Sequence, residues 1–184
     1  MSKLLPQSGF GGYAKSWQDI SITEIEDYEL VALSVATGAE DKFTKTFRKI
    51  FECAPPDPNQ FKKSKHSQIL WSRPGQYLVL QNEVDILSDV KIAAQFNETA
   101  YTVLQSDGWG ALDVKGSAVY DVLERFIPLN LKDAPVGFAA RTAAHHIGVY
   151  ILKTAKDEFI LLTPRSSSGS FLEGLVHTVE NVIS

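Results

Sequence analysis

The sequence predicts an α+β domain made of two similar β-α-β-β-α halves with a mainly antiparallel sheet. Short runs rich in β-branched and aromatic residues alternate with amphipathic segments of helical spacing. Turn residues separate neighbouring runs by only a few positions, as in antiparallel hairpins. Short motifs also recur in the same order along the chain, which favours an internal duplication, although a shared helix and strand pattern without common ancestry would produce part of this agreement.

Composition limits the function classes. The chain has 184 residues, of which 44% are hydrophobic and 22% charged, as in an ordinary globular protein. A formal net charge of −4 gives no electrostatic reason to expect nucleic acid or an anionic membrane as a partner. No apolar run reaches the roughly 18 residues of a membrane span, and the first twenty residues contain no signal-peptide core. We therefore expect a cytoplasmic protein.

The expected domain is a single bilobal unit over residues 19–184, preceded by a flexible arm over residues 1–18. The arm shows no periodicity, although it contains Leu4, Leu5, Phe10, Tyr13 and Trp17. These apolar side chains fit either an arm that lies on its own domain or one that docks on a partner.

Two strands and a helix are expected first. Residues 20–26 and 28–35 are rich in Val, Ile and Tyr and are predicted strands. A helix follows Gly38, because apolar side chains recur there on one face while basic side chains remain in water. The apolar face consists of Phe43, Phe47, Ile50 and Phe51. Prolines 55, 56 and 58 end this helix.

A turn and a second helix complete the first half. Residues 66–71 and 76–80 are predicted strands on either side of a turn that contains Pro74 and Gly75. A weaker amphipathic pattern predicts a helix over residues 84–96.

The middle of the chain carries the sequence signal of a tight hairpin. Asp107-Gly108 lies between two strand-forming runs, residues 99–104 and 109–114. Ser117 then precedes an amphipathic run through Phe126, so we expect Ser117 to cap a helix.

The second half repeats the pattern of the first. Residues 136–144 and 146–153 are expected to form a hairpin, residues 158–162 a returning strand, and the region after Gly169 a terminal helix. The buried face of that helix is predicted to hold Phe171, Leu172, Leu175, Val176, Val179 and Val182.

Three short matches give the register of the repeat, with halves over residues 19–98 and 99–184. The matched segments are Ala32-Leu33 and Val35 with Ala111-Leu112 and Val114, Ile69-Leu70 with Ile151-Leu152, and residues 77–80 with residues 159–162.

Candidate catalytic chemistry is sparse. His145 and His146 are adjacent on a predicted strand, so their side chains should point to opposite faces and cannot bind one metal. Cys53 is the only cysteine, which excludes an internal disulfide, and we expect it to be an inert apolar residue. The serines at 166–168 are expected to cap the last helix, although this helix start beside Arg165 also suits an anion. We predict no metal, cofactor or catalytic site in this chain.

An ordered set of motifs resembles the gamma subunit of heterotetrameric sarcosine oxidase over roughly residues 20–183. The motifs are Trp71-Ser72-Arg73-Pro74-Gly75-Gln76-Tyr77-Leu78, Gln105-Ser106-Asp107-Gly108-Trp109, Pro128-Leu129, Pro135-Val136-Gly137 with Ala140-Arg141-Thr142, and residues 159–162 with Pro164-Arg165-Ser166. More remotely, the Ser-Asp-x-Trp hairpin and the following Gly-Ser-x-Ala helix start are similar to the folate-binding domain of aminomethyltransferases, the glycine-cleavage T-protein group.

The resemblance implies a non-catalytic subunit of a flavoenzyme that demethylates sarcosine to glycine with tetrahydrofolate and oxygen. In that family, FAD, FMN, NAD and tetrahydrofolate are expected in the alpha and beta subunits and zinc in the delta subunit. The gamma subunit is expected to pack against the alpha subunit.

Two departures from the related patterns matter. Active folate-domain relatives carry an Asp in the first-half hairpin, whereas this turn offers Arg73, Pro74, Gly75 and Gln76, so a carboxylate base is missing there. The family also more often has an aromatic residue after Arg165-Ser166, which bears on the packing of the last helix. The alternative is a stand-alone folate-binding or folate-dependent aminomethyltransferase-like protein.

Four residues are candidates for the partner interface, namely Trp71, Arg73, Trp109 and Arg141. Trp and Arg are enriched at binding hot spots because they bury a large area and keep a polar group. Burial of both indoles in the core is the other interpretation.

Overall fold

The computed structural model describes residues 7–81 and 89–183. The strands are β1 Ala14–Ser16, β2 Ser21–Ile25, β3 Glu29–Val35, β4 Phe61–Lys63, β5 Ser67–Arg73, β6 Gln76–Gln81, β7 Ala100–Leu104, β8 Trp109–Lys115, β9 Ala139–Ala144, β10 Ile147–Ala155 and β11 Glu158–Pro164. The helices are α1 Glu40–Phe51, α2 Asp89–Phe96, α3 Val119–Phe126 and α4 Ser168–Ile183, with 3₁₀ turns at Ser106–Gly108 and Arg165–Ser167. The predicted helix over residues 84–96 therefore begins, within the described residues, at Asp89, and positions 84–88 lie outside them.

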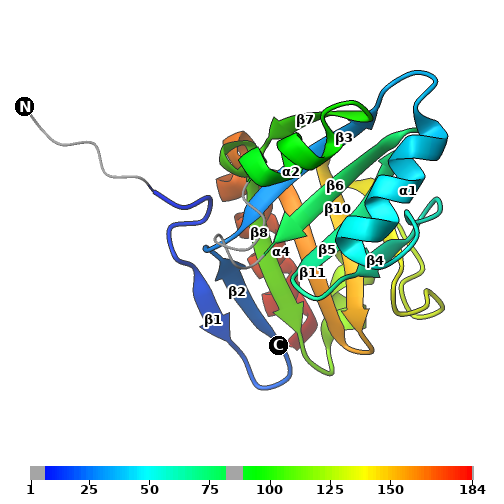
Figure 1. Ribbon diagram of the computed structural model, residues 1–184. Helices are drawn as coiled ribbons and strands as arrows, with labels where there is room; N and C mark the ends of the chain where they lie inside the picture. The colour runs from blue at the N-terminus through cyan, green and yellow to red at the C-terminus, as the bar shows by residue number, and fades with distance from the viewer. Residues whose placement is uncertain (1–6, 82–88, 184) are drawn as a thin grey trace, which may run out of the picture.

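Two antiparallel sheets form the centre of the fold (Figure 1). The six-stranded sheet has the order β1-β2-β8-β11-β10-β9, and the five-stranded sheet has the order β4-β5-β6-β3-β7. Helices α1 and α2 pack on one face of the five-stranded sheet, and α3 and α4 on one face of the six-stranded sheet. The predicted α+β class with mainly antiparallel sheet is confirmed.

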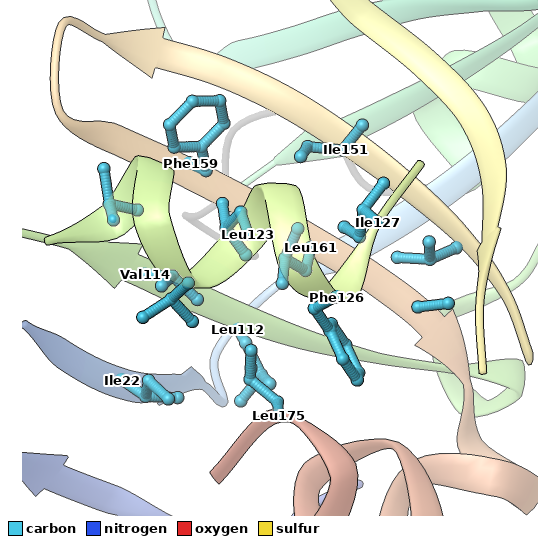
Figure 2. Close-up of a cluster of buried hydrophobic side chains, with 14 of the residues drawn as sticks. Ile22, Leu112, Val114, Leu123, Phe126, Ile127, Ile151, Phe159, Leu161 and Leu175 are labelled. Carbon is cyan, nitrogen blue, oxygen red and sulfur yellow. The ribbon is translucent and has the colours of Figure 1, made fainter. Parts of the chain in front are cut away.

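Three apolar clusters hold these layers together. Phe43, Phe47 and Phe51 of α1 pack against the five-stranded sheet, as the helical spacing predicts. Figure 2 shows the corresponding cluster under α3 and α4, where Leu123 and Leu175 face the six-stranded sheet. A third cluster fills the space between the sheets. Burying each of these large side chains stabilises the fold by about 1.5–3 kcal/mol.

The repeat register seen in the sequence holds in three dimensions. Leu33 and its match Leu112 both face helices, whereas Leu70 and its match Leu152 both face the other sheet. Residues 77–80 and 159–162 alternate in the same way between helix side and sheet side. Matched residues thus occupy equivalent positions in the two halves.

The predicted central hairpin is wrong. β7 pairs with β3 in the five-stranded sheet, whereas β8 pairs with β2 and β11 in the six-stranded sheet. The 3₁₀ turn at Ser106–Gly108 carries the chain from one sheet to the other. β2 makes the equivalent exchange, because it lies in the six-stranded sheet while β3, which follows it, lies in the other. Each half thus contributes its first strand to the sheet of the other half.

Two local predictions also fail. The hydroxyl of Ser117 donates to Asp19 at 3.2 Å, and Ala118 occupies the N-cap position of α3 without a side-chain cap. His145 and His146 form the β9–β10 turn, not part of a strand, with φ values of 46° and 70°. Both residues adopt the left-handed conformation that a two-residue hairpin turn requires.

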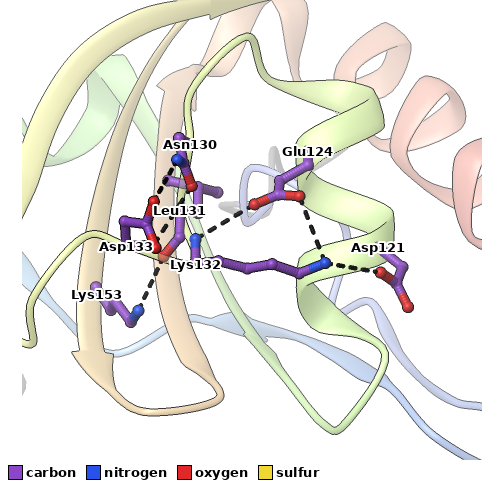
Figure 3. Close-up of polar contacts among 7 residues, drawn as sticks. All are labelled: Asp121, Glu124, Asn130, Leu131, Lys132, Asp133 and Lys153. Carbon is purple, nitrogen blue, oxygen red and sulfur yellow. Dashed lines mark hydrogen bonds and ion pairs between the residues drawn. The ribbon is translucent and has the colours of Figure 1, made fainter.

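A buried lysine holds the loop after α3 to the six-stranded sheet (Figure 3). Lys153 of β10 is 4% exposed, and its Nζ donates to the carbonyl oxygens of Leu131 at 2.9 Å and Ala134 at 2.7 Å. The ring of Tyr120 lies 4.8 Å from the same Nζ. Neutral carbonyls and an aromatic face therefore surround this ammonium group.

Candidate functional site

The described residues contain no cluster of metal-ligating side chains. Within residues 7–81 and 89–183, no group of three His, Cys, Asp or Glu side chains is placed to hold a metal ion. Burial raises the pKa of the Cys53 thiol, more than the nearby Lys62 lowers it, so the reactive thiolate is disfavoured. His145 packs its ring on Phe126, with centroids 5.0 Å apart. In the same described ranges, no helix combines the length and apolar character needed to cross a membrane.

Two of the four predicted site residues contact the ring of Tyr150 in β10. Its side chain lies in the cluster between the sheets and is 4% exposed. Its hydroxyl oxygen is 2.6 Å from that of Ser72 in the five-stranded sheet. The Trp109 ring packs on the Tyr150 ring at 5.3 Å, and the Arg141 guanidinium lies 5.6 Å from its centroid. Trp109 and Arg141 are therefore brought together through Tyr150.

The other two candidates lie apart from this contact. Trp71 is half-buried, and its neighbour along the strand face, Ile69, belongs to the cluster on the helix side. Arg73 is exposed where β5 turns into β6, next to the Pro74-Gly75 turn. Ser72 lies two positions after Leu70, which faces the other sheet, so the alternation of the strand directs Ser72 to Tyr150. A role of the four residues in partner binding stays a prediction.

A hollow of about 260 Å³ lies beside Trp109, at the start of β8. It is lined by Gln7, Ser8, Gly9, Glu24, Ile25, Glu26, Tyr28, Ser106, Asp107, Trp109 and Arg165. Tyr28 donates its hydroxyl to the Trp109 carbonyl at 2.6 Å, and the Arg165 guanidinium donates to the Gln7 carbonyl. Burial, with a smaller contribution from Glu24, raises the pKa of Tyr28 to about 12.

Glu24 attaches the N-terminal segment to the domain. Its carboxylate accepts the backbone N–H of Phe10 at 2.8 Å and of Gly12 at 2.7 Å, and the Ser8 hydroxyl at 2.9 Å. A buried carboxylate with three donors is engaged in structure and is not free to act as a general base. In its described part, the predicted flexible arm is thus a glycine turn and the edge strand β1, which pairs with β2.

The sequence contains a signal for Glu24. Ile20, Ile22 and Glu24 alternate along one strand and are all buried, so the strand period places a carboxylate on the apolar face. Of the serines predicted to cap the last helix, Ser168 instead donates its hydroxyl to the carbonyls of Gly9 at 2.6 Å and Arg165 at 2.9 Å. Ser168 therefore also fixes the N-terminal segment.

Comparison with known proteins gives a fold relationship. No protein-family model and no curated protein matches the sequence. Among solved structures, heterotetrameric sarcosine oxidase from Corynebacterium sp. U-96 has a chain that superposes with a TM-score of 0.79 at 18% identity, over 90% of this chain and 86% of that chain. The chain shares that fold. Glycine cleavage system aminomethyltransferase T from Bartonella henselae superposes with a TM-score of 0.69 at 10% identity, over 86% of this chain.

The resemblance predicted from the motifs is thus confirmed at the level of fold. This chain covers 45% of the aminomethyltransferase chain, or less than half of its length, but 86% of the oxidase chain. The structural similarity therefore extends over most of the oxidase chain, whereas it covers only one part of the aminomethyltransferase chain.

Proposed function

We propose that this chain is the gamma subunit of a heterotetrameric sarcosine oxidase, with a structural role against the alpha subunit. The observation that carries the proposal is the shared fold, with a TM-score of 0.79 over 90% of this chain and 86% of a chain of such an oxidase. The ordered motifs from Trp71 to Ser166 support the same assignment.

The use of the polar side chains supports a non-catalytic role. Glu24, Arg165 and Ser168 hold the N-terminal segment, and the Tyr150 hydroxyl joins the two sheets. In this proposal, FAD, FMN, NAD and tetrahydrofolate belong to the alpha and beta subunits and zinc to the delta subunit, and the oxidation of sarcosine takes place there.

Co-expression tests the proposal. The tagged chain should co-purify with the alpha, beta and delta chains as one complex that oxidises sarcosine, and by itself it should be inert with sarcosine, tetrahydrofolate and oxygen. Failure of the large flavoprotein chains to co-purify, together with tetrahydrofolate-dependent activity of the isolated chain, would favour the aminomethyltransferase-like alternative.

A further inference from the structure

β7 is an edge strand of the five-stranded sheet with an apolar and uncharged surface. Among the described residues it pairs only with β3. Tyr101 is 73% exposed, Val103 55% and Leu104 48%. Residues 99–106 contain no charged side chain. Edge strands of monomeric proteins are usually protected by Lys, Pro or a covering segment, so an apolar uncharged edge is suited to pairing with another strand.

The hydrogen bonds to β3 show which backbone groups of β7 face outward. Gln105 donates its N–H to Leu30, and Ala36 donates to the Thr99 carbonyl. In an antiparallel ladder the bonded positions alternate, so Tyr101 and Val103 direct their backbone groups towards β3. The N–H and C=O groups of Ala100, Thr102 and Leu104 therefore point to the open edge.

The equivalent strand of the other sheet pairs with an additional antiparallel strand on its outer side. β2 occupies the position in the six-stranded sheet that β7 occupies in the five-stranded sheet, next to the first long strand of the repeat. The outer side of β2 is covered by the antiparallel strand β1. In the described ranges, β7 has no counterpart of β1.

We propose that the isolated chain forms a symmetric dimer in which β7 pairs with β7 of a second copy, antiparallel and centred on Thr102. With this register, Ala100 faces Leu104 of the second copy and the two Thr102 residues face each other, so all six outward N–H groups find carbonyl partners. The proposal goes beyond the proposed function and does not rest on it.

The side chains of β7 are complementary to those of a second copy of β7, which favours a second copy of this chain as the pairing partner. The register places Tyr101 opposite Val103 of the other copy twice, on one face, and aromatic and β-branched residues are favourable cross-strand pairs. The charged residues nearest to the strand do not oppose each other, because Glu98 falls opposite Ser106 and Asp107 opposite Asn97. Pairing therefore removes apolar side chains from water without bringing like charges together.

Light scattering coupled to gel filtration of the full chain, in a dilution series, tests the dimer. The wild-type mass should be twice the 20.3 kDa of one chain and should fall to 20.3 kDa on dilution. Thr102→Pro removes an outward N–H and leaves the β3 ladder intact, so it should be monomeric. Thr102→Val keeps the N–H and the shape, and as the matched control it should dimerise like the wild type.

Thr102→Lys provides a second variant in case the proline disturbs folding. It puts two ammonium groups directly opposite each other in the dimer, which is destabilising, while a lysine on a free edge strand is well tolerated in the monomer. Circular dichroism checks that each variant is folded. A wild-type chain that is monomeric throughout the dilution series, or a dimer that persists in folded Thr102→Pro or Thr102→Lys, overturns the proposal.

Discussion

The hydroxyl oxygens of Ser72 and Tyr150 lie 2.6 Å apart, and their hydrogen bond joins the five-stranded sheet to the six-stranded sheet. Most other contacts between the inner faces are apolar. This bond is therefore a directional polar contact within a mainly apolar interface, at the position where Trp109 and Arg141 contact the Tyr150 ring.

Tyr150→Phe tests this link. The variant loses one intramolecular hydrogen bond, so we expect the free energy of unfolding in urea to fall by about 1 kcal/mol. In a double-mutant cycle, Ser72→Ala combined with Tyr150→Phe should cost less than the sum of the single changes. Strict additivity would show that the two hydroxyls do not interact.

Lys153→Met should destabilise the protein by about 3 kcal/mol, because two backbone carbonyls, those of Leu131 and Ala134, lose their buried donor. The control is Lys132→Met, whose ion pairs with Asp121 at 3.4 Å and Glu124 at 3.8 Å lie at the surface (Figure 3). We expect the control to change the free energy of unfolding by about 1 kcal/mol or less. Equal effects of the two substitutions would contradict a structural role of the buried lysine.

Tyr28 predicts a loss of stability at alkaline pH. Burial raises its pKa from 10 to about 12, so the folded state disfavours the phenolate. A raised folded-state pKa gives stability that is complete below pH 10 and is lost between pH 10 and about 12. Urea unfolding across this range should show a steeper loss for the wild type than for Tyr28→Phe. Parallel curves for the two proteins would be inconsistent with this assignment.

Arg73→Ala should weaken assembly with the proposed partner subunits and leave the fold intact. Arg73 is exposed at a turn, and surface substitutions of this kind usually change stability by about 0.5 kcal/mol or less. Co-purification yield and thermal melting measure the two effects. A melting temperature many degrees lower for the isolated variant would assign Arg73 a structural role.

Calorimetric titration with tetrahydrofolate separates the two functions considered. A structural subunit should give no binding heat, since the first-half turn offers Arg73 to Gln76 and no carboxylate. A micromolar one-to-one isotherm would instead support the folate-binding alternative. Co-purification with the large chains in the same preparation provides the independent control.

Only two residues of the contact around Tyr150 were selected from the sequence. Residue type alone selected Trp109 and Arg141, because large side chains with a polar group are frequent in binding surfaces. Their common contact, Tyr150, was not predicted, since Tyr150 in β10 and Ser72 in β5 meet only when the two sheets pack. Glu24 was similarly missed as the anchor of the N-terminal segment, although its strand period placed it on the buried face.

The sequence by itself determined the α+β class, the apolar face of α1 and the repeat register of Leu33 with Leu112, because the period of apolar residues is a local property of the chain. Only the tertiary structure decided the strand exchange. Asp107-Gly108 has the local chemistry of a hairpin turn, but β7 and β8 have their pairing partners in different sheets. Strand pairing depends on which apolar faces become buried together, and that selection is made among segments far apart in the sequence.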